Sequence, residues 1–306
     1  MHPAKSIILF TTISGMGYGL IISLLIFQIY VGHTLSFISY FLIFVLSMAL
    51  VSGGLLSSTL HLGHPERAHF ALTQWRSSWL SREGVFAILL YPVIAIYTLL
   101  FYLNPDNRSL DTLSIIIVLI AIATIFSTGK IYSSLRAIYS WNTELTTFNY
   151  LALGGLTGLM LLQSLLLLMG YNLANIYYYL IILIILSCIG KILYWVRLDL
   201  NNTTTNKSTA LGLKSQLQVN LLESPHDASN FLLKEMGYKV ARKHSKKLRK
   251  IALLFAFILP LLIIFLSVAL NFYHITILAF LFMIMGVFME RWLFFAEAKH
   301  SVMNYY

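Results

Sequence analysis

Eight long apolar runs constrain the fold of this chain more than any other feature. Hydrophobic residues make up 58% of the 306 positions and charged residues only 10%, a composition far more apolar than that of an ordinary soluble domain. A helix needs roughly 20 apolar residues to cross a bilayer, and runs of that length lie at 6–31, 36–61, 83–104, 111–135, 148–170, 176–197, 251–272 and 274–296. We therefore predict an all-α, polytopic membrane protein with eight transmembrane helices.

The basic residues predict how these helices are oriented. Cytoplasmic loops of membrane proteins carry an excess of Lys and Arg. If the N-terminus is cytoplasmic, 20 of the 21 Lys and Arg residues face inside and only Arg108 faces outside. We therefore expect both termini to lie in the cytoplasm.

The sequence divides into three parts. Residues 1–198 hold the first six helices and a connection, 61–83, that is rich in His, Arg and Glu; residues 251–306 hold the last two helices and a short tail. The insertion between them, 199–250, carries ten Lys and Arg against four Asp and Glu. Apolar residues interleaved with these charges predict a basic amphipathic helix, which lies on anionic lipid or docks a partner.

The connection 61–83 contains the first candidate site. His61 ends the second apolar run and Glu83 opens the third, and because consecutive helices are antiparallel the two residues are expected at one membrane depth. Both side chains also complement helix dipoles in these positions. A histidine and a carboxylate can exchange protons with a quinone, which takes up or releases two protons with two electrons. Flanking this pair are Arg67, Trp75, Arg76 and Trp79.

Further ionisable residues are expected at the same depth on other helices. A repeated pattern, G-K-I-x4-R, places Lys130 and Arg136 at the end of the fourth run and Lys191 and Arg197 at the end of the sixth. Basic residues at helix ends commonly reach to the interface with their charged groups. Buried ionisable groups in a membrane also mark functional sites, so the secondary candidates are His64, Lys130, Arg136, Lys191 and Glu290.

Several other chemistries find little support in the residue pattern. The single cysteine, Cys188, cannot supply an iron–sulfur cluster or a zinc finger, which need about four ligands, so we expect no metal site. A haem would need a deep pair of axial histidines, and His33 and His274 lie at helix ends. A transporter should carry polar groups near the midplane, where little beyond Gln163 and Ser164 is found.

Two pairs of glycines predict one close helix contact. Gly15 and Gly19 in the first run, and Gly154 and Gly158 in the fifth, have the spacing that lets membrane helices approach closely. We assign these residues to assembly of the bundle.

Three stretches carry a resemblance to a known family. "SSTLHLGHPERA" at 57–68, "SREG" at 81–84 and "KIYSSLRAIYSWNT" at 130–143 resemble the membrane-anchor subunit of the dimethyl sulfoxide reductase family of molybdenum enzymes. This resemblance implies eight helices in a bacterial inner membrane, a quinone site for which His61 and Glu83 are the matching residues, and no haem. The insertion segment "ESPHDASNFLLKEMGYKVARKHSKKLRK" at 223–250 resembles the anchor of the cytoplasm-facing, sulfite-oxidising branch.

The resemblance also implies partners and a function. The anchor would pass electrons between the membrane pool of menaquinone or ubiquinone and a ferredoxin-like iron–sulfur subunit, which contacts a molybdopterin catalytic subunit. Iron–sulfur clusters and molybdopterin would lie only in those partners, so we expect no substrate turnover by this chain alone and no nucleic acid partner. Because the basic residues place the polar side in the cytoplasm, sulfite oxidation is favoured over the alternative, quinol oxidation by a dimethyl sulfoxide reductase.

Overall fold

The described part of the protein is helical. The computed structural model describes residues 4–31, 35–60, 64–105, 107–172, 175–200, 207–213, 219–220, 222–223 and 240–301. His61 lies outside these residues, as do His33 and positions 224–239 of the insertion.

Eight helices in this part are long and apolar enough to cross a membrane, which confirms the predicted fold class. The first six spans are α1 (Lys5–Val31), α2 (Phe37–Thr59), α3 (Trp79–Leu103), α4 (Ser109–Ser133), α5 (Glu144–Leu168) and α6 (Ile176–Leu200). The seventh joins α9 (Val240–Leu253), the π turn η2 (Leu254–Ile258) and α10 (Leu259–Ala269), and the eighth is α11 (Thr276–Ala296). Shorter elements are η1 (Pro65–Gln74), α7 (Lys207–Ala210) and η3 (Tyr273–Ile275).

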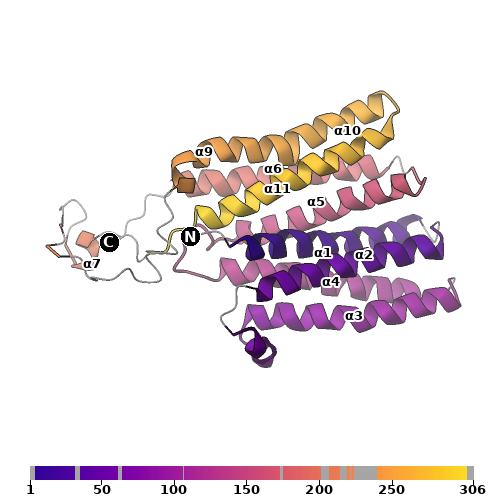
Figure 1. Ribbon diagram of the computed structural model, residues 1–306, viewed down its shortest axis with the longest axis horizontal. Coiled ribbons are helices and arrows are strands. Elements are labelled where there is room, and N and C mark those ends of the chain that lie inside the picture. Colours follow the sequence, from indigo (N-terminus) through magenta and orange to yellow (C-terminus); the bar gives the residue numbers. More distant parts are fainter. Residues whose placement is uncertain are drawn as a thin grey trace.

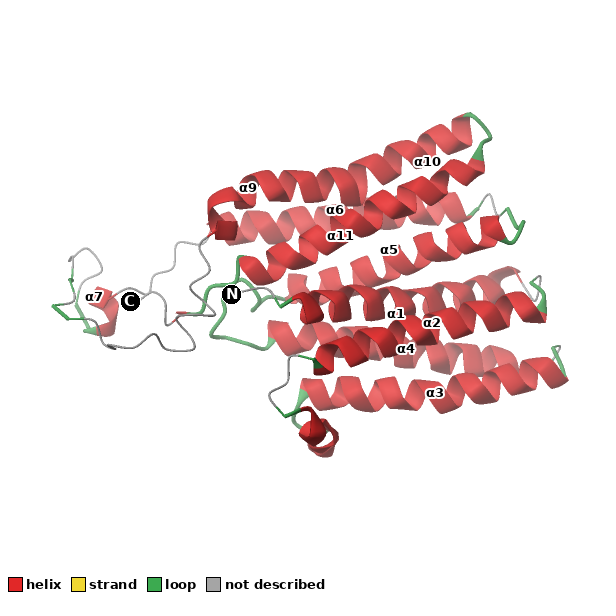
Figure 2. Cartoon of the chain, in the orientation of Figure 1, coloured by secondary structure: helices red, strands yellow, loops and turns green. Residues whose placement is uncertain are grey.

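The spans lie side by side along the long axis of the molecule (Figure 1). Because they alternate in direction, α1 begins and α11 ends at the same end of the bundle, and η1 packs beside the beginning of α3 at that end. The segment 134–143 between α4 and α5 also lies there, and the backbone of Ser301 pairs with that of Ala137. At the opposite end, the described residues between the helices form short turns and the helical turn η3 (Figure 2).

The centre of the bundle is the contact between α1 and α5. A Cβ added at Gly158 on α5 would lie 2.0 Å from the backbone carbon of Gly19 on α1, and one added at Gly154 would lie 3.2 Å from the carbonyl oxygen of Gly15. The two backbones touch here because neither side has a side chain in the way. The predicted packing role of these four glycines is confirmed.

Three predicted helix starts differ from the structure by four residues or more, for identifiable reasons. The fifth helix begins at Glu144 instead of 148, because the Thr143 hydroxyl caps it by accepting from the Leu145 amide at 3.4 Å. The third helix begins at Trp79 instead of 83, because the Ser78 hydroxyl caps it by accepting from the Ser81 amide at 3.4 Å. The helix that contains the seventh span begins at Val240 instead of 251. Its charged first turns are stabilised by Arg249, which bonds Asp199 and Glu297 at 2.8 Å each.

Candidate functional site

Glu83 lies inside the bundle, one turn from the start of α3. Its side chain is 3% exposed, and the first turn of α3 holds no acidic residue. The helix dipole acts within the first turn, so it does not account for Glu83. A carboxylate removed from water in an apolar bundle costs several kcal/mol unless it is paired, which leaves a functional reason for retaining it.

The partner of Glu83 is Thr128 on α4. The Thr128 hydroxyl donates to a Glu83 carboxylate oxygen, and it also lies 3.1 Å from the carbonyl oxygen of Thr124. A hydroxyl has one hydrogen and two lone pairs. It can therefore donate to ionised Glu83, or donate to Thr124 while accepting from protonated Glu83. The contact holds the carboxyl group in place in both protonation states, as a proton-exchanging group requires.

The turn before α3 is organised by Arg82. Its guanidinium donates to the carbonyl oxygens of Trp75 at 3.0 Å and of Arg76 at 2.6 Å. The guanidinium carbon also lies 4.2 Å from the centroid of the Trp79 ring, a cation–π contact. Arg82 therefore fixes the backbone that carries Trp75 and Arg76, a role that the sequence pattern alone does not indicate.

The segment η1 is attached to the first two turns of α3. The Ser81 hydroxyl donates to the carbonyl oxygen of Ala71, and a Cβ at Gly84 would lie 2.8 Å from a methyl carbon of Leu72. Gly84 thus leaves room for the Leu72 side chain. The S-R-E-G sequence at 81–84 places Glu83 inside the bundle while Ser81 and Gly84 hold η1 against α3.

The other residues predicted around Glu83 are more exposed. Trp79 is half-buried, one helical turn before Glu83, with its ring centroid 5.8 Å from that of Phe126 on α4. Arg67, Trp75 and Arg76 are exposed on η1 and the turn after it. His64 is also exposed and lies 2.9 Å from a carboxylate oxygen of Glu66.

The secondary candidates fall into separate groups. Lys130 pairs with Glu144 on α5 at 2.7 Å, where the Glu144 side chain is 82% exposed. Arg136 is exposed in the segment after α4. Lys191, in contrast, is 1% exposed and pairs with Glu290 on α11, also 1% exposed.

The Lys191–Glu290 pair belongs to a larger buried cluster. The second carboxylate oxygen of Glu290 lies 3.6 Å from the Arg291 guanidinium, whose carbon lies 3.9 Å from the centroid of the Tyr150 ring. The Lys191 ammonium lies 4.2 Å from the centroid of the Tyr194 ring. Two cations and one carboxylate give the cluster a net positive charge. The rings of Tyr150 and Tyr194 face the two cations and stabilise them by cation–π contacts.

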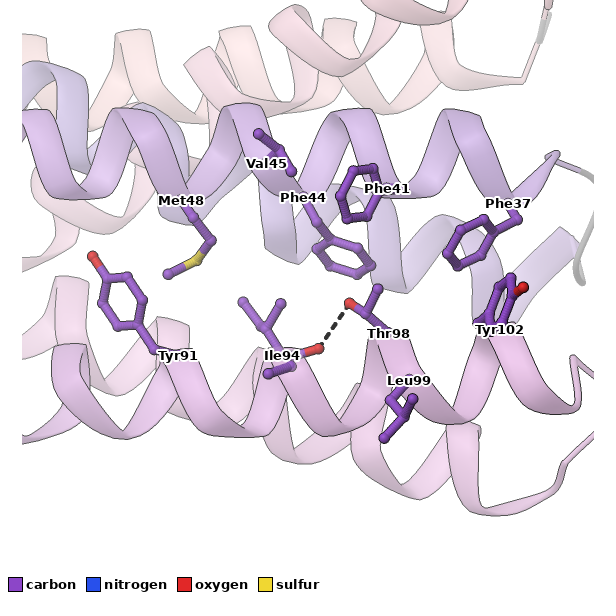
Figure 3. Close-up of a pocket in the computed structure, with 11 residues that line it drawn as sticks. Phe37, Phe41, Phe44, Val45, Met48, Tyr91, Ile94, Thr98, Leu99 and Tyr102 are labelled. Carbon is purple, nitrogen blue, oxygen red and sulfur yellow. Dashed lines mark hydrogen bonds between the residues drawn. The ribbon is translucent and has the colours of Figure 1, made fainter.

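An apolar groove lies between α2 and α3 (Figure 3). Its volume is about 560 Å³. Two hydroxyl groups on its walls are already hydrogen-bonded: that of Tyr91 to the Ser52 hydroxyl at 2.7 Å, and that of Thr98 to the carbonyl oxygen of Ile94 at 2.8 Å. The lining is Phe37, Phe41, Phe44, Val45, Met48, Tyr91, Ile94, Ala95, Thr98, Leu99 and Tyr102. Such a groove can take a hydrocarbon tail, because its lining holds no charged side chain.

Sequence reasoning missed Thr128, Tyr18 and Tyr150. Threonine and tyrosine are common in apolar helices, and only the packing of α1, α4 and α5 brings these three to one cavity. Within the described part of the protein, no group of three or more His, Cys, Asp or Glu side chains could hold a metal ion.

Comparison with known proteins covers nearly the whole sequence. The model of the family "DMSO reductase anchor subunit (DmsC)" matches residues 1–296. The C subunit of sulfite dehydrogenase from Allochromatium vinosum is 30% identical over 324 aligned residues, which cover 100% of this chain and 99% of the relative. The C chain of anaerobic dimethyl sulfoxide reductase from Haemophilus influenzae is 31% identical over 114 residues, 36% of this chain and 40% of the relative. No solved structure matches.

Proposed function

Because this chain belongs to the family of dimethyl sulfoxide reductase anchor subunits, we propose that it is the quinone-reactive membrane anchor of a molybdopterin oxidoreductase complex. The chain is a multi-pass membrane protein. In this role it passes electrons between an iron–sulfur subunit and menaquinone or ubiquinone in a bacterial inner membrane. The molybdopterin chemistry takes place in a separate catalytic subunit.

The observation that carries this proposal is the buried Glu83–Thr128 pair. A quinone oxygen that gains an electron needs a proton, and a carboxyl group held in place in both protonation states can supply one. Trp79, one turn away on the same side of α3, supplies an aromatic surface against which a quinone ring can pack. His61 is the proposed second ligand, on the strength of its place just after α2.

The groove between α2 and α3 supports a place for the quinone tail. Tyr91, at one end of its lining, follows Glu83 by eight residues, about 12 Å along a helix axis. An isoprenoid tail seated there would leave its ring toward Glu83. The far end of the tail would stay in contact with lipid.

Of the two reactions considered for the complex, sulfite oxidation with reduction of quinone is favoured. The relative that aligns over the full length is a sulfite dehydrogenase subunit, whereas the dimethyl sulfoxide reductase relative aligns over 36% of this chain. The predicted orientation, with 20 of 21 basic residues in the cytoplasm, also places the polar end of the bundle toward a cytoplasmic partner. A dimethyl sulfoxide reductase anchor is the second candidate.

The test is activity of the whole complex, purified through a tag on this chain. We expect two partner subunits to copurify and sulfite to reduce a short-chain quinone. In cells that lack the anchor, the partner subunits should be released from the membrane. They should still oxidise sulfite with an artificial dye but should no longer reduce quinone. A complex that instead oxidises quinol with dimethyl sulfoxide would establish the second candidate, and a complex active with neither quinone nor quinol would contradict the proposal.

A further inference from the structure

A small internal cavity lies next to the Glu83–Thr128 pair. Its walls come from three helices and include Thr11, Ser14 and Tyr18 on α1, Thr128 on α4 and Tyr150 on α5. The cavity offers about 10 Å³ to the centre of a water molecule, at the lower limit of what one buried water needs.

The polar atoms on the cavity wall can hold such a water. The hydroxyls of Tyr18 and Tyr150, in side chains 2% and 3% exposed, have no hydrogen-bond partner among the described residues. Thr11 and Ser14 donate to backbone carbonyls at 3.0 Å and 2.6 Å, which leaves their oxygens free to accept. A buried water typically makes about three hydrogen bonds, and these hydroxyls, with Thr128, supply enough donors and acceptors.

We propose that one water in this cavity, held by Thr128 and by the Tyr18 and Tyr150 hydroxyls, is the last step of a proton path that runs from the end of the bundle where α1 begins to Glu83 at the quinone site. This inference rests on the function proposed above. Reduction of one quinone consumes two electrons, which the iron–sulfur partner supplies, and two protons. Glu83 gives one of these protons to a quinone oxygen. The resulting carboxylate regains a proton through Thr128 and the water, which is replenished from the end of the bundle where α1 begins, and Glu83 can then supply the second proton.

The test uses conservative variants in the whole complex. Tyr18→Phe and Tyr150→Phe each remove one hydroxyl from the cavity wall and leave the ring in place. We expect quinone reduction to fall by about tenfold or more, below the 10²–10⁴-fold scale for losing a proton donor itself, with dye-linked activity unchanged. A small permeant weak acid such as azide, which carries protons past a blocked path, should restore much of the quinone-linked rate.

Tyr40→Phe is the matched control. Tyr40 on α2 is 1% exposed and its hydroxyl also lacks a hydrogen-bond partner among the described residues, but it does not line the cavity. This variant should reduce quinone at the parent rate. Equal losses in all three tyrosine variants would mean that the effect is one of packing, and would overturn the proposal.

Glu83→Gln separates failure of the path from failure of the proposed function. If that variant loses quinone reduction while Tyr18→Phe and Tyr150→Phe keep the parent rate and solvent isotope effect, the path is wrong and the quinone site stands. If Glu83→Gln itself keeps the parent rate, the site is elsewhere and the path falls with it. Slow turnover of both cavity variants, rescued by azide, would support both proposals.

Discussion

The Thr128 hydroxyl on α4 donates a hydrogen bond to the Glu83 carboxylate on α3, inside the bundle, where both residues are buried. The residues are 45 positions apart in the sequence and meet because α3 and α4 form an antiparallel pair. An unpaired carboxylate here would be costly, so Thr128 makes the position tolerable. Because a hydroxyl can both donate and accept, it also allows the carboxyl group to change its protonation state.

Removing one partner of the Lys191–Glu290 pair should destabilise the protein more than neutralising both partners. Lys191→Met leaves a buried Glu290 with only Arg291 beside it, and removing one partner of a buried pair costs roughly 3–5 kcal/mol. We expect a clear fall in the thermal unfolding temperature of the purified complex, measured in detergent. The double variant Lys191→Met/Glu290→Gln should recover part of the loss, and a double variant less stable than the single one would contradict this account.

The contact between α1 and α5 should tolerate no side chain at Gly158. Gly158→Leu would push the two backbones apart, because even a Cβ at that position would lie 2.0 Å from Gly19. We expect little assembled complex in the membrane by immunoblotting. The matched control is Gly53→Leu on α2, since a Cβ at Gly53 would meet no atom within 4 Å, and this variant should accumulate normally.

The attachment of η1 to α3 should depend on the space at Gly84. Gly84→Val would displace the Leu72 side chain, because a Cβ there would lie 2.8 Å from its methyl carbon. We expect a spin label at Thr73 to become more mobile, as measured by electron paramagnetic resonance. Leu72→Ala/Gly84→Val should restore the parent spectrum, whereas unchanged mobility in Gly84→Val alone would show that η1 is not held by this contact.

The predicted orientation can be tested with reporter fusions. With 20 of 21 Lys and Arg residues on the side of the termini, that side should be cytoplasmic. A C-terminal alkaline phosphatase fusion should be inactive and a C-terminal green fluorescent protein fusion fluorescent. A phosphatase inserted after Arg108, between α3 and α4, should be active, and the reverse pattern would place both termini outside.

The sequence predicts the helices well because membrane spans follow from apolar length alone. It fails at the start of the third, fifth and seventh helices, where charged or polar residues are helical. At the third, Ser78 caps a helix whose first turn precedes the apolar run; at the seventh, Arg249 finds Asp199 and Glu297 in space. Apolar length carries no information about either contact.

The candidate site is less accessible to sequence reasoning. Glu83 stands out because a carboxylate next to an apolar run is rare, and the Gly-Lys-Ile repeat draws attention to Lys130 and Lys191. The repeat does not reveal that Lys130 pairs with an exposed Glu144 whereas Lys191 is buried against Glu290. That difference depends on which helix faces each lysine, and so does the meeting of Tyr18, Thr128 and Tyr150 at one cavity.

The most direct test of the central claim is quinone-linked turnover of the Glu83→Gln complex beside its dye-linked turnover. Glutamine keeps the shape of the side chain and can still bond Thr128, but it cannot exchange a proton. We predict that quinone-linked turnover falls by roughly 10²–10⁴-fold while dye-linked turnover and complex assembly stay at the parent level. Parent-level quinone turnover in a normally assembled Glu83→Gln complex would contradict the account.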